Sequence, residues 1–409
     1  MPSRRQLLAA ASAGTAALAG CSALADRPEP EPLPDAAPSG DDWPLLRYDS
    51  HNTGWNGAAD PPDEPAERWA TDVGWGFRPL VRGTKVVLNT YDGVMALRAT
   101  DGEVLWIAGE GGGYRQPGLG AERAYLPDYD CVRGFDLASG EETWRQQTCD
   151  GANTSAPVVA RGRLYMEASY FVAFDGAGRA TWAAYGDARR APTVAGDTAF
   201  AVVAGELAAL DLTVEPDRPA PWAEAPDRPV VDREQVRRWG RSYRGRVRHS
   251  PTVHDDLVVA GDEDTGQATL FAHDQADGHR EWRFRADAGE NGGLFTVPVS
   301  DGERVYVGSD DGTMYAVSGG EAAWSRDLDG LPNRVAGAGD TLFVGTYTGD
   351  QAPGTLYALD PATGETRWQV AYDDEIRGVS AAGGSVYVTV VTDRQDDGDI
   401  VSTTLYAYG

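Results

Sequence analysis

Lysine is nearly absent from this chain. Of its 409 residues only Lys85 is a lysine, and 36 Lys+Arg stand against 63 Asp+Glu, a formal net charge of −27. Nucleic acids are bound through a net basic face, so this charge disfavours bare nucleic-acid binding, and we expect no nucleic-acid partner. Acidity spread over the whole length, with arginine retained, indicates adaptation to concentrated salt. The alternative is an acidic surface that simply resists association.

Cysteines and long apolar runs are also scarce. The three cysteines, Cys21, Cys131 and Cys149, are not adjacent, and after the first twenty residues no stretch approaches 18 uninterrupted apolar residues. The mature chain is therefore expected to be tethered to a membrane and not embedded in it. Gly-x-Ser-x-Gly, Walker and Cys-x-x-Cys motifs are missing, and the five histidines show no metal spacing. We expect no catalytic residues and no metal site.

The first residues have the pattern of an export signal. Arg4 and Arg5 precede a mostly apolar run to Ala19 that is too short for a permanent membrane span. Paired arginines before such a run are typical of twin-arginine export, and Leu18-Ala19-Gly20-Cys21 resembles the lipobox of lipoproteins. We expect a signal peptide at 1–20, a lipidated Cys21 that opens a Pro/acid-rich linker at 21–42, and anchoring to the outer face of the cell membrane. A chance cysteine beside an ordinary cleavage site is the alternative.

The other two cysteines flank a predicted hairpin. Cys131 opens a strand at 131–136, and Cys149 lies just past a strand at 142–147. Pairing Asp136 with Glu142 places Cys131 opposite Gln147, one diagonal step from Cys149. Outside the cytosol the two can form a disulfide, and two separate buried thiols are the alternative.

A repeat of about 40 residues organises the chain after residue 60. Most repeats contain an apolar strand ending in Asp, a turn with glycine and a short strand carrying a tryptophan, as from Ala358 to Trp368. Four short strands per repeat indicate a β-propeller blade. The tryptophans are Trp69, Trp106, Trp144, Trp182, Trp239, Trp282, Trp324 and Trp368.

The two ends of the array predict a closed ring. The last repeat stops at Gly409 without a tryptophan strand, and the strand around Trp69 precedes the first complete repeat. Pairing the two completes an eighth blade and removes exposed sheet edges. The prediction is an all-β, eight-bladed propeller of four-stranded blades over 43–409, with a Pro/acid-rich insertion at 214–236 in blade four. Innermost strands are expected to start near Leu80, Gly118, Val158, Thr193, Thr252, Val299, Arg334 and Gly378.

A family resemblance follows from these phrases. Ala-x-Asp-x-x-Thr-Gly-x-x-x-Trp, matched from Ala358 to Trp368, resembles the repeat of pyrroloquinoline-quinone-type, or quinoprotein-like, β-propellers. The segment from Trp43 to Gly54 also resembles the sequence that precedes many of them. This superfamily includes quinoprotein alcohol dehydrogenases and the propeller lipoprotein of the bacterial barrel-assembly machinery. The resemblance implies that the eight tryptophans dock one blade against the next.

Two functions are compatible with the resemblance. The first is a non-catalytic binding or assembly scaffold, a monomer whose partners are other proteins of the cell envelope. The second is a quinone-dependent oxidoreductase or a binder of a small anion at the central channel. The dehydrogenases stack their quinone on a ring of two adjacent cysteines, bind calcium through carboxylate and amide oxygens and use an aspartate base. Because no two cysteines are adjacent here, we expect no cofactor, with pyrroloquinoline quinone and calcium as the alternative.

Arginines recur at or just before the innermost strands, which line the channel of a propeller. We hypothesise that they gather at one mouth and bind a carboxylate, a phosphate or an acidic segment. The alternative is pairing with neighbouring acids such as Asp373, Asp374 and Glu375. The arginines are Arg78, Arg115, Arg189 with Arg190, Arg248, Arg334 and Arg377.

A second basic stretch, Arg233 to Arg248, holds seven arginines. Because Trp239 within it is an in-register blade tryptophan, we assign these arginines to neutralisation of an acidic neighbourhood. A docking strip for anionic headgroups is the alternative.

Overall fold

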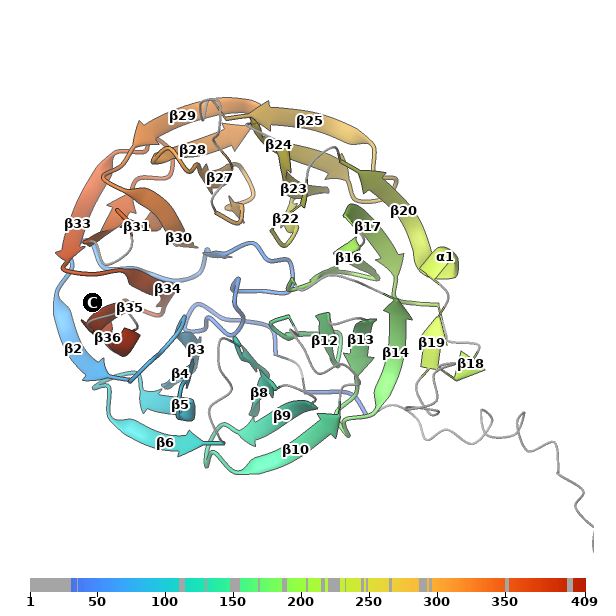
Figure 1. Cartoon of the computed structure of the whole chain (residues 1–409), viewed down its shortest axis with the longest axis horizontal. Helices are drawn as coiled ribbons and strands as arrows, with labels where there is room; N and C mark the ends of the chain where they lie inside the picture. Colours follow the sequence, from blue (N-terminus) through green and yellow to red (C-terminus); the bar gives the residue numbers. More distant parts are fainter. Residues whose placement is uncertain are drawn as a thin grey trace, which may run out of the picture.

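The computed structural model describes residues 31–34, 36–109, 115–128, 131–147, 155–167, 170–185, 190–203, 205–214, 218–219, 229–231, 233–243, 246–247, 249–264, 267–286, 293, 296–349, 353–395 and 400–409. Eight antiparallel sheets surround one axis (Figure 1). Each sheet is a blade with four main strands, so the chain forms the eight-bladed propeller that the repeat predicts. No helix in these described ranges is long and apolar enough to cross a membrane.

Each blade is built from its innermost strand outward. The first four blades are β3 (Leu80–Arg82), β4 (Lys85–Thr90), β5 (Gly93–Arg98) and β6 (Val104–Ala108); β7 (Gly118–Leu119), β8 (Arg123–Pro127), β9 (Cys131–Asp136) and β10 (Glu142–Gln147); β11 (Val158–Ala160), β12 (Arg163–Glu167), β13 (Tyr170–Phe174) and β14 (Ala180–Tyr185); and β15 (Thr193–Ala195), β16 (Thr198–Val203), β17 (Glu206–Asp211) and β20 (Arg237–Ser242). The last four are β22 (Thr252–His254), β23 (Leu257–Asp264), β24 (Gln267–Asp274) and β25 (Arg280–Arg285), with β21 (Arg246–Val247) also on β23; β26 (Val299–Ser300), β27 (Val305–Gly308), β28 (Thr313–Ser318) and β29 (Glu321–Asp327); β30 (Leu331–Ala338), β31 (Thr341–Tyr347), β32 (Gly354–Leu359) and β33 (Thr366–Tyr372); and β34 (Ile376–Ala382), β35 (Ser385–Arg394), β36 (Ile400–Tyr408) and β2 (Glu67–Asp72).

The innermost strands start close to the predicted positions. In blades one to six they begin at the predicted residue, whereas β30 begins three residues before Arg334 and β34 begins two residues before Gly378. The register of both strands shifts just before these residues, between Pro332 and Arg334 and between Ile376 and Gly378. A bulge lets pairing continue past an irregular residue, so these two strands reach further than the repeat predicts.

Burial along the strands follows their place in the blade. Every residue of the middle strand β16 is buried, because it has a neighbouring blade on each face. The outermost strand β29 is mostly exposed, with one half-buried tryptophan, Trp324. The apolar core therefore lies in the layers between blades, and the polar residues lie on the rim.

The ring is closed by the two ends of the array. Strand β2 pairs antiparallel with β36, with Trp69 opposite Ala407, as predicted. The segment between β17 and β20 adds the short strands β18 (Arg218–Pro219) and β19 (Pro229–Val231) and the helix α1 (Arg233–Val236). Strand β19 pairs in parallel with β14, so this segment extends the sheet of blade three at the outer rim.

Residues 40–56, the axial segment, cross the middle of the ring (Figure 1). They include β1 (Trp55–Asn56), which pairs in parallel with β30. Backbone hydrogen bonds join the axial segment to the innermost strand, or the turn after it, in seven blades, and Leu33 makes the corresponding bond to blade three. The bonded pairs are Trp43–Val81, Pro44–Leu119, Ser50–Val194, His51–Val253, Thr53–Ser300, Gly54–Gly337, Gly40–Gly383 and Leu33–Gly162.

The two ends of the axis therefore differ. We call the end with the connections between blades the crossover end, and the other the turn end. Several residues on either side of the axial segment bond to turns of the turn end, for example Leu33 N to Gly162 O at 2.7 Å and Asp60 N to Gly383 O at 3.3 Å. The innermost strands start at the crossover end, the end at which Arg78, Arg334 and Arg377 lie.

Candidate functional site

The tryptophan of an outermost strand lies against a turn of the next blade. Trp324 Nε1 donates a hydrogen bond to Pro361 O at 2.9 Å, and its ring lies over Gly364. Gly364 has a φ of +74°, and a Cβ added there would lie 2.8 Å from Trp324 Cε3. Glycine is needed for both reasons. The same ring-over-glycine contact pairs Trp69 with Gly102, Trp106 with Gly140, Trp144 with Gly178 and Trp239 with Gly278, whereas a Cβ added to Gly320 would lie closest to Trp282 Cβ, at 2.9 Å.

The other two tryptophans make variants of this contact. Trp182 Nε1 donates to Val214 O at 3.1 Å, in the segment that follows β17. Trp368 Nε1 donates to Pro62 O at 3.3 Å, in the segment before β2. One repeat phrase therefore takes part in two contacts between blades. Its glycine lies under the tryptophan of the preceding blade, and its own tryptophan packs against the following blade.

Three of the predicted arginines lie together at the crossover end of the axis. Arg334 Nε donates to Arg377 O at 2.7 Å. Arg78 is buried, and a Cβ added to Gly378 would lie 2.5 Å from Arg78 Cα. The chain therefore brings blades one, seven and eight together around these side chains.

The other two predicted arginines that the structure describes make different contacts. Arg115 Nη1 is 3.4 Å from Asp128 Oδ1, within blade two. Arg190 lies near the buried carboxyl of Glu167; burial raises the pKa of Glu167 well above its ordinary range, and Arg190 opposes this rise. Arg189 and Arg248 fall outside the described residues.

A fourth arginine, Arg47, joins this group from the axial segment. Tyr48 N donates to Leu45 O at 3.0 Å and Tyr48 has a φ of +71°, so residues 45–48 form a tight turn with Arg47 near its tip. Arg47 Nη2 donates to Pro298 O at 2.6 Å. Sequence reasoning missed it because it belongs to no repeat; the signal was a single arginine within the phrase from Trp43 to Gly54.

The electrostatics of this group are unfavourable. Burial lowers the pKa of Arg47 to about 10, and Asp49 opposes this shift. Burial lowers the pKa of Arg78 well below its ordinary value, and repulsion by Arg47 and Arg334 lowers it further. Burial lowers the pKa of Arg334, and repulsion by Arg377 lowers it further, while the Glu375 carboxylate raises it. The four guanidinium groups thus repel one another in a poorly solvated place.

Direct pairing with acids involves only one of the four among the described residues. Arg377 Nη1 lies 3.5 Å from Glu375 Oε1. That carboxylate is shared with Arg394, which also binds Asp374 Oδ2 at 2.7 Å. The predicted alternative, pairing with neighbouring acids, therefore describes Arg377, whereas Arg78 donates to Leu46 O at 3.1 Å.

An aromatic ladder, Tyr91–Trp75–Phe77, runs outward from the arginines on the crossover face. The rings of Trp75 and Tyr91 stack with centroids 6.3 Å apart and planes 5° apart. Trp75 and Phe77 stack at 6.5 Å, and the Arg377 guanidinium lies 5.5 Å from the Phe77 centroid. Tyr91 is 68% exposed. An exposed tyrosine on a stacked support offers a rigid, amphipathic contact surface.

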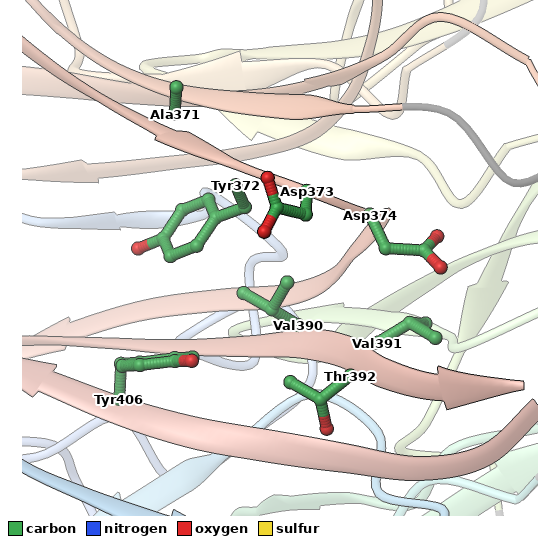
Figure 2. A pocket seen from close by; sticks show the side chains of 8 residues that line it. All are labelled: Ala371, Tyr372, Asp373, Asp374, Val390, Val391, Thr392 and Tyr406. Atoms are coloured by element: carbon green, nitrogen blue, oxygen red, sulfur yellow. The ribbon is translucent and has the colours of Figure 1, made fainter.

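A cavity of about 370 Å³ lies between blades seven and eight on the same side (Figure 2). Figure 2 shows Tyr372, Asp373 and Asp374 across from Val390, Val391 and Thr392, with Tyr406 on the next strand. Tyr372 donates a hydrogen bond to Tyr408 Oη at 2.8 Å. Burial alone raises the pKa of Asp374, but hydrogen bonds from Arg394 and the Glu375 N–H bring it below its ordinary value. The cavity thus has one apolar and one anionic wall.

The basic stretch from Arg233 to Arg248 packs within blade four where its side chains are described. Arg238 Nη2 is 3.0 Å from Asp211 Oδ2, and Arg237 Nη1 is 3.5 Å from Glu206 Oε2. Arg241 Nε donates to Gly278 O at 2.7 Å. These contacts neutralise acids and dock blade five, and they leave no open basic strip across these three side chains.

The described residues test the cysteine and metal predictions only in part. Cys131 is buried in β9 opposite Gln147, as predicted, although Glu142 lies opposite Phe135 and not Asp136 because the register shifts between Glu142 and Trp144. Cys149, Cys21, Arg4 and Arg5 lie outside the described residues. Over those same ranges, no three His, Cys, Asp or Glu side chains are placed to bind a metal ion.

Comparison with known proteins gives one family. The family model described as outer membrane protein assembly factor BamB matches residues 92–214, 235–328 and 318–402. These ranges run through most blades of the ring.

Individual relatives are more distant. The chain is 31% identical over 147 residues to the serine/threonine-protein kinase AfsK of Streptomyces griseus, a match that covers 34% of this chain and only 18% of the kinase. Quinohemoprotein alcohol dehydrogenase ADHIIG from Pseudomonas putida HK5 is 10% identical with a TM-score of 0.62, over 90% of this chain and 80% of that one. BamB from Moraxella catarrhalis is 16% identical with a TM-score of 0.47, over 79% of each chain. The dehydrogenase likeness concerns the fold.

Proposed function

Because the chain belongs to the family described as outer membrane protein assembly factor BamB, we propose that it is a lipid-anchored, extracytoplasmic propeller that binds other proteins of the cell envelope as a non-catalytic scaffold. In this proposal the signal peptide that contains Arg4 and Arg5 directs export of the chain, and Cys21 carries the lipid anchor. The eight blade tryptophans keep the ring rigid, which suits a protein whose faces serve as docking surfaces.

The observation that carries the docking role is the aromatic ladder on the crossover face. Tyr91 exposes 68% of its surface, and its ring is held by Trp75. Tyrosine and tryptophan dominate the energetics of protein interfaces, since they bury a large area at a low cost in conformational entropy. We propose that an extended segment of an envelope protein docks along Tyr91 and Trp75 and reaches toward Phe77.

The residues at the axis do not fit the calcium–quinone site of the dehydrogenases. That site needs two adjacent cysteines and converging carboxylates, whereas no cysteines are adjacent here and four arginines gather at the crossover end. The axial segment, moreover, bonds to the inner strands through the middle of the ring. Dye-linked oxidation of alcohols or sugars by the purified protein with added quinone and calcium would overturn the scaffold proposal.

The docking proposal is tested by co-purification of the anchored protein in concentrated salt. Tyr91→Ala should lose the partner proteins that the parent retains. Ile107→Ala is the matched control, because Ile107 is 50% exposed on the outer strand β6. Equal retention by both variants would contradict a docking site on the crossover face.

The anchor has a separate test. Cys21→Ser should release the protein from the membrane fraction, and Cys131→Ser should leave it there. A Cys21→Ser protein that still sediments with membranes would refute lipidation at this residue.

A further inference from the structure

We propose that Arg47, Arg78, Arg334 and Arg377 form a binding site for a small oxyanion, a carboxylate or a phosphate, at the crossover end of the axis. This proposal is independent of the docking role, which concerns the outer part of the same face. It revises the group predicted from the repeat: Arg115, which pairs with Asp128, and Arg190, which lies near Glu167, leave the group, and Arg47 enters it.

Four separate elements bring these side chains together. Arg47 comes from the turn at 45–48, and Arg78 from the connection that precedes β3. Arg334 lies in β30, and Arg377 in β34. The first two are joined by the bond from Arg78 Nη1 to Leu46 O at 3.1 Å, and the last two by the bond from Arg334 Nε to Arg377 O at 2.7 Å.

The glycine between these pairs allows the close approach. A Cβ at Gly378 would lie 2.5 Å from Arg78 Cα and 2.9 Å from Thr389 Oγ1, distances that side chains do not adopt. Gly378 therefore lets blade one meet blade eight beside Arg377. Thr389 Oγ1 is buried, has no hydrogen-bond partner in the described part of the chain, and can donate to an anion.

Three of the four charges at this place, Arg47, Arg78 and Arg334, have no acidic partner among the described residues, and Arg377 pairs with Glu375 at 3.5 Å. Arg47 and Arg78 are only 5% and 6% exposed, and their hydrogen bonds go to backbone carbonyls. Arg47 Nε and Arg377 Nε are buried without an acceptor among the described residues. A guanidinium has five N–H donors, and leaving a buried charge uncompensated is costly.

The acids nearby do not balance the group. Asp49 accepts hydrogen bonds from Thr53 N at 3.0 Å and Thr53 Oγ1 at 2.9 Å, and forms no ion pair with Arg47. Glu375 is shared between Arg377 and Arg394. The group therefore carries a local excess of positive charge in a chain of net charge −27.

An oxyanion fits these donors better than a halide does. The fork of a guanidinium matches the two oxygens of a carboxylate or phosphate, so several N–H groups can be satisfied at once. Because Arg47 and Arg78 are almost fully buried, we expect the bound group to be small. That group is either a free metabolite-sized anion or a carboxylate at the tip of a partner segment.

Calorimetric titration of the intact purified protein tests the site, with inorganic phosphate, citrate and a Glu-rich peptide as separate probes at fixed ionic strength in concentrated KCl. We expect at least one probe to bind. Arg334→Gln and Arg377→Gln should each weaken binding about tenfold, the loss expected for one charge-assisted hydrogen bond. Arg334→Lys should recover part of the affinity, since it restores the charge without the fork.

The control variant is Arg98→Gln, because Arg98 pairs with Asp101 and Glu103 on the exposed rim. Circular dichroism of each variant verifies the fold, and two independent substitutions at the site guard against one that fails to fold. Binding of phosphate or citrate identifies a free anion, and binding of the peptide alone identifies a partner carboxylate. Absence of binding by every probe would overturn the proposal, and so would an equal loss in Arg98→Gln. A signal that added bromide reproduces would indicate an adventitious ion only and would overturn it as well.

Discussion

Replacing Gly364 by alanine tests the contact that docks one blade on the next. The added Cβ would lie 2.8, 2.9 and 3.1 Å from three ring atoms of Trp324. The ring is held by its hydrogen bond to Pro361 O and by contact with Tyr306, so it cannot move away freely. Overpacking of this kind costs about 1–3 kcal/mol. The φ of +74° adds roughly 1–2 kcal/mol for any residue with a Cβ.

The matched control is Gly196→Ala, in the turn between β15 and β16. Gly196 has a φ of +52°, and nothing lies within 4 Å of an added Cβ. This variant therefore carries the backbone strain alone, roughly 1–2 kcal/mol. The difference between the two variants isolates the collision with Trp324, about 1–3 kcal/mol.

Equilibrium urea unfolding in concentrated salt, followed by circular dichroism, measures both losses. Gly364→Ala should lower the free energy of unfolding by roughly 2–5 kcal/mol, against roughly 1–2 kcal/mol for Gly196→Ala. Equal losses in the two variants would mean that the ring of Trp324 yields without cost. The glycine of the repeat would then be needed for its backbone conformation only.

Two further predictions concern buried polar groups. Burial raises the pKa of Glu167 above its unfolded value of about 4.3, so the folded state keeps the proton of this carboxyl to a higher pH than the unfolded state does. The free energy of unfolding should therefore fall as the pH rises from about 4.3 through the folded pKa, and Glu167→Gln should remove this decline. Urea midpoints of the parent and of Glu167→Gln that run parallel from acid to neutral pH would contradict this prediction. Asn52 Nδ2 donates to Thr193 Oγ1 at 2.7 Å and to the carbonyls of Pro192 and Pro251. Asn52→Ala should cost about 1–3 kcal/mol and Asn52→Asp more at neutral pH, because an acceptor then faces carbonyl oxygens; an aspartate variant as stable as the alanine one would refute this account.

The propeller architecture could be predicted because the sequence repeat determines the number of blades and where each blade begins. Most phrases end in a tryptophan that packs on a glycine turn of the next blade, so the number and spacing of the eight tryptophans set the number and boundaries of the blades. The same regularity placed six innermost strands at their first residue. Bulges before Arg334 and Gly378 are local features with no counterpart in the repeat, and they account for the two differences.

The candidate site was only partly predictable. Arg78, Arg334 and Arg377 occupy equivalent places in their repeats, and that pattern is visible in the sequence. Arg47 lies in the axial segment, which contacts the blades through backbone hydrogen bonds that leave no side-chain pattern. Arg115 shares the repeat position, but Asp128 on the neighbouring loop pairs with it, a contact that depends on how that loop folds.

The pairing of β2 with β36 has a consequence for the order of folding. Trp69 and its partner Ala407 are separated by almost the whole propeller in sequence, so β2 stays without its sheet until β36 has been synthesised. The blades between them can form one after another from local contacts, but the slow step, closing a very long loop, comes last. During synthesis the nascent chain is thus an open arc with two unpaired edges, vulnerable to proteases and to pairing with other chains, and it becomes resistant in a single late event.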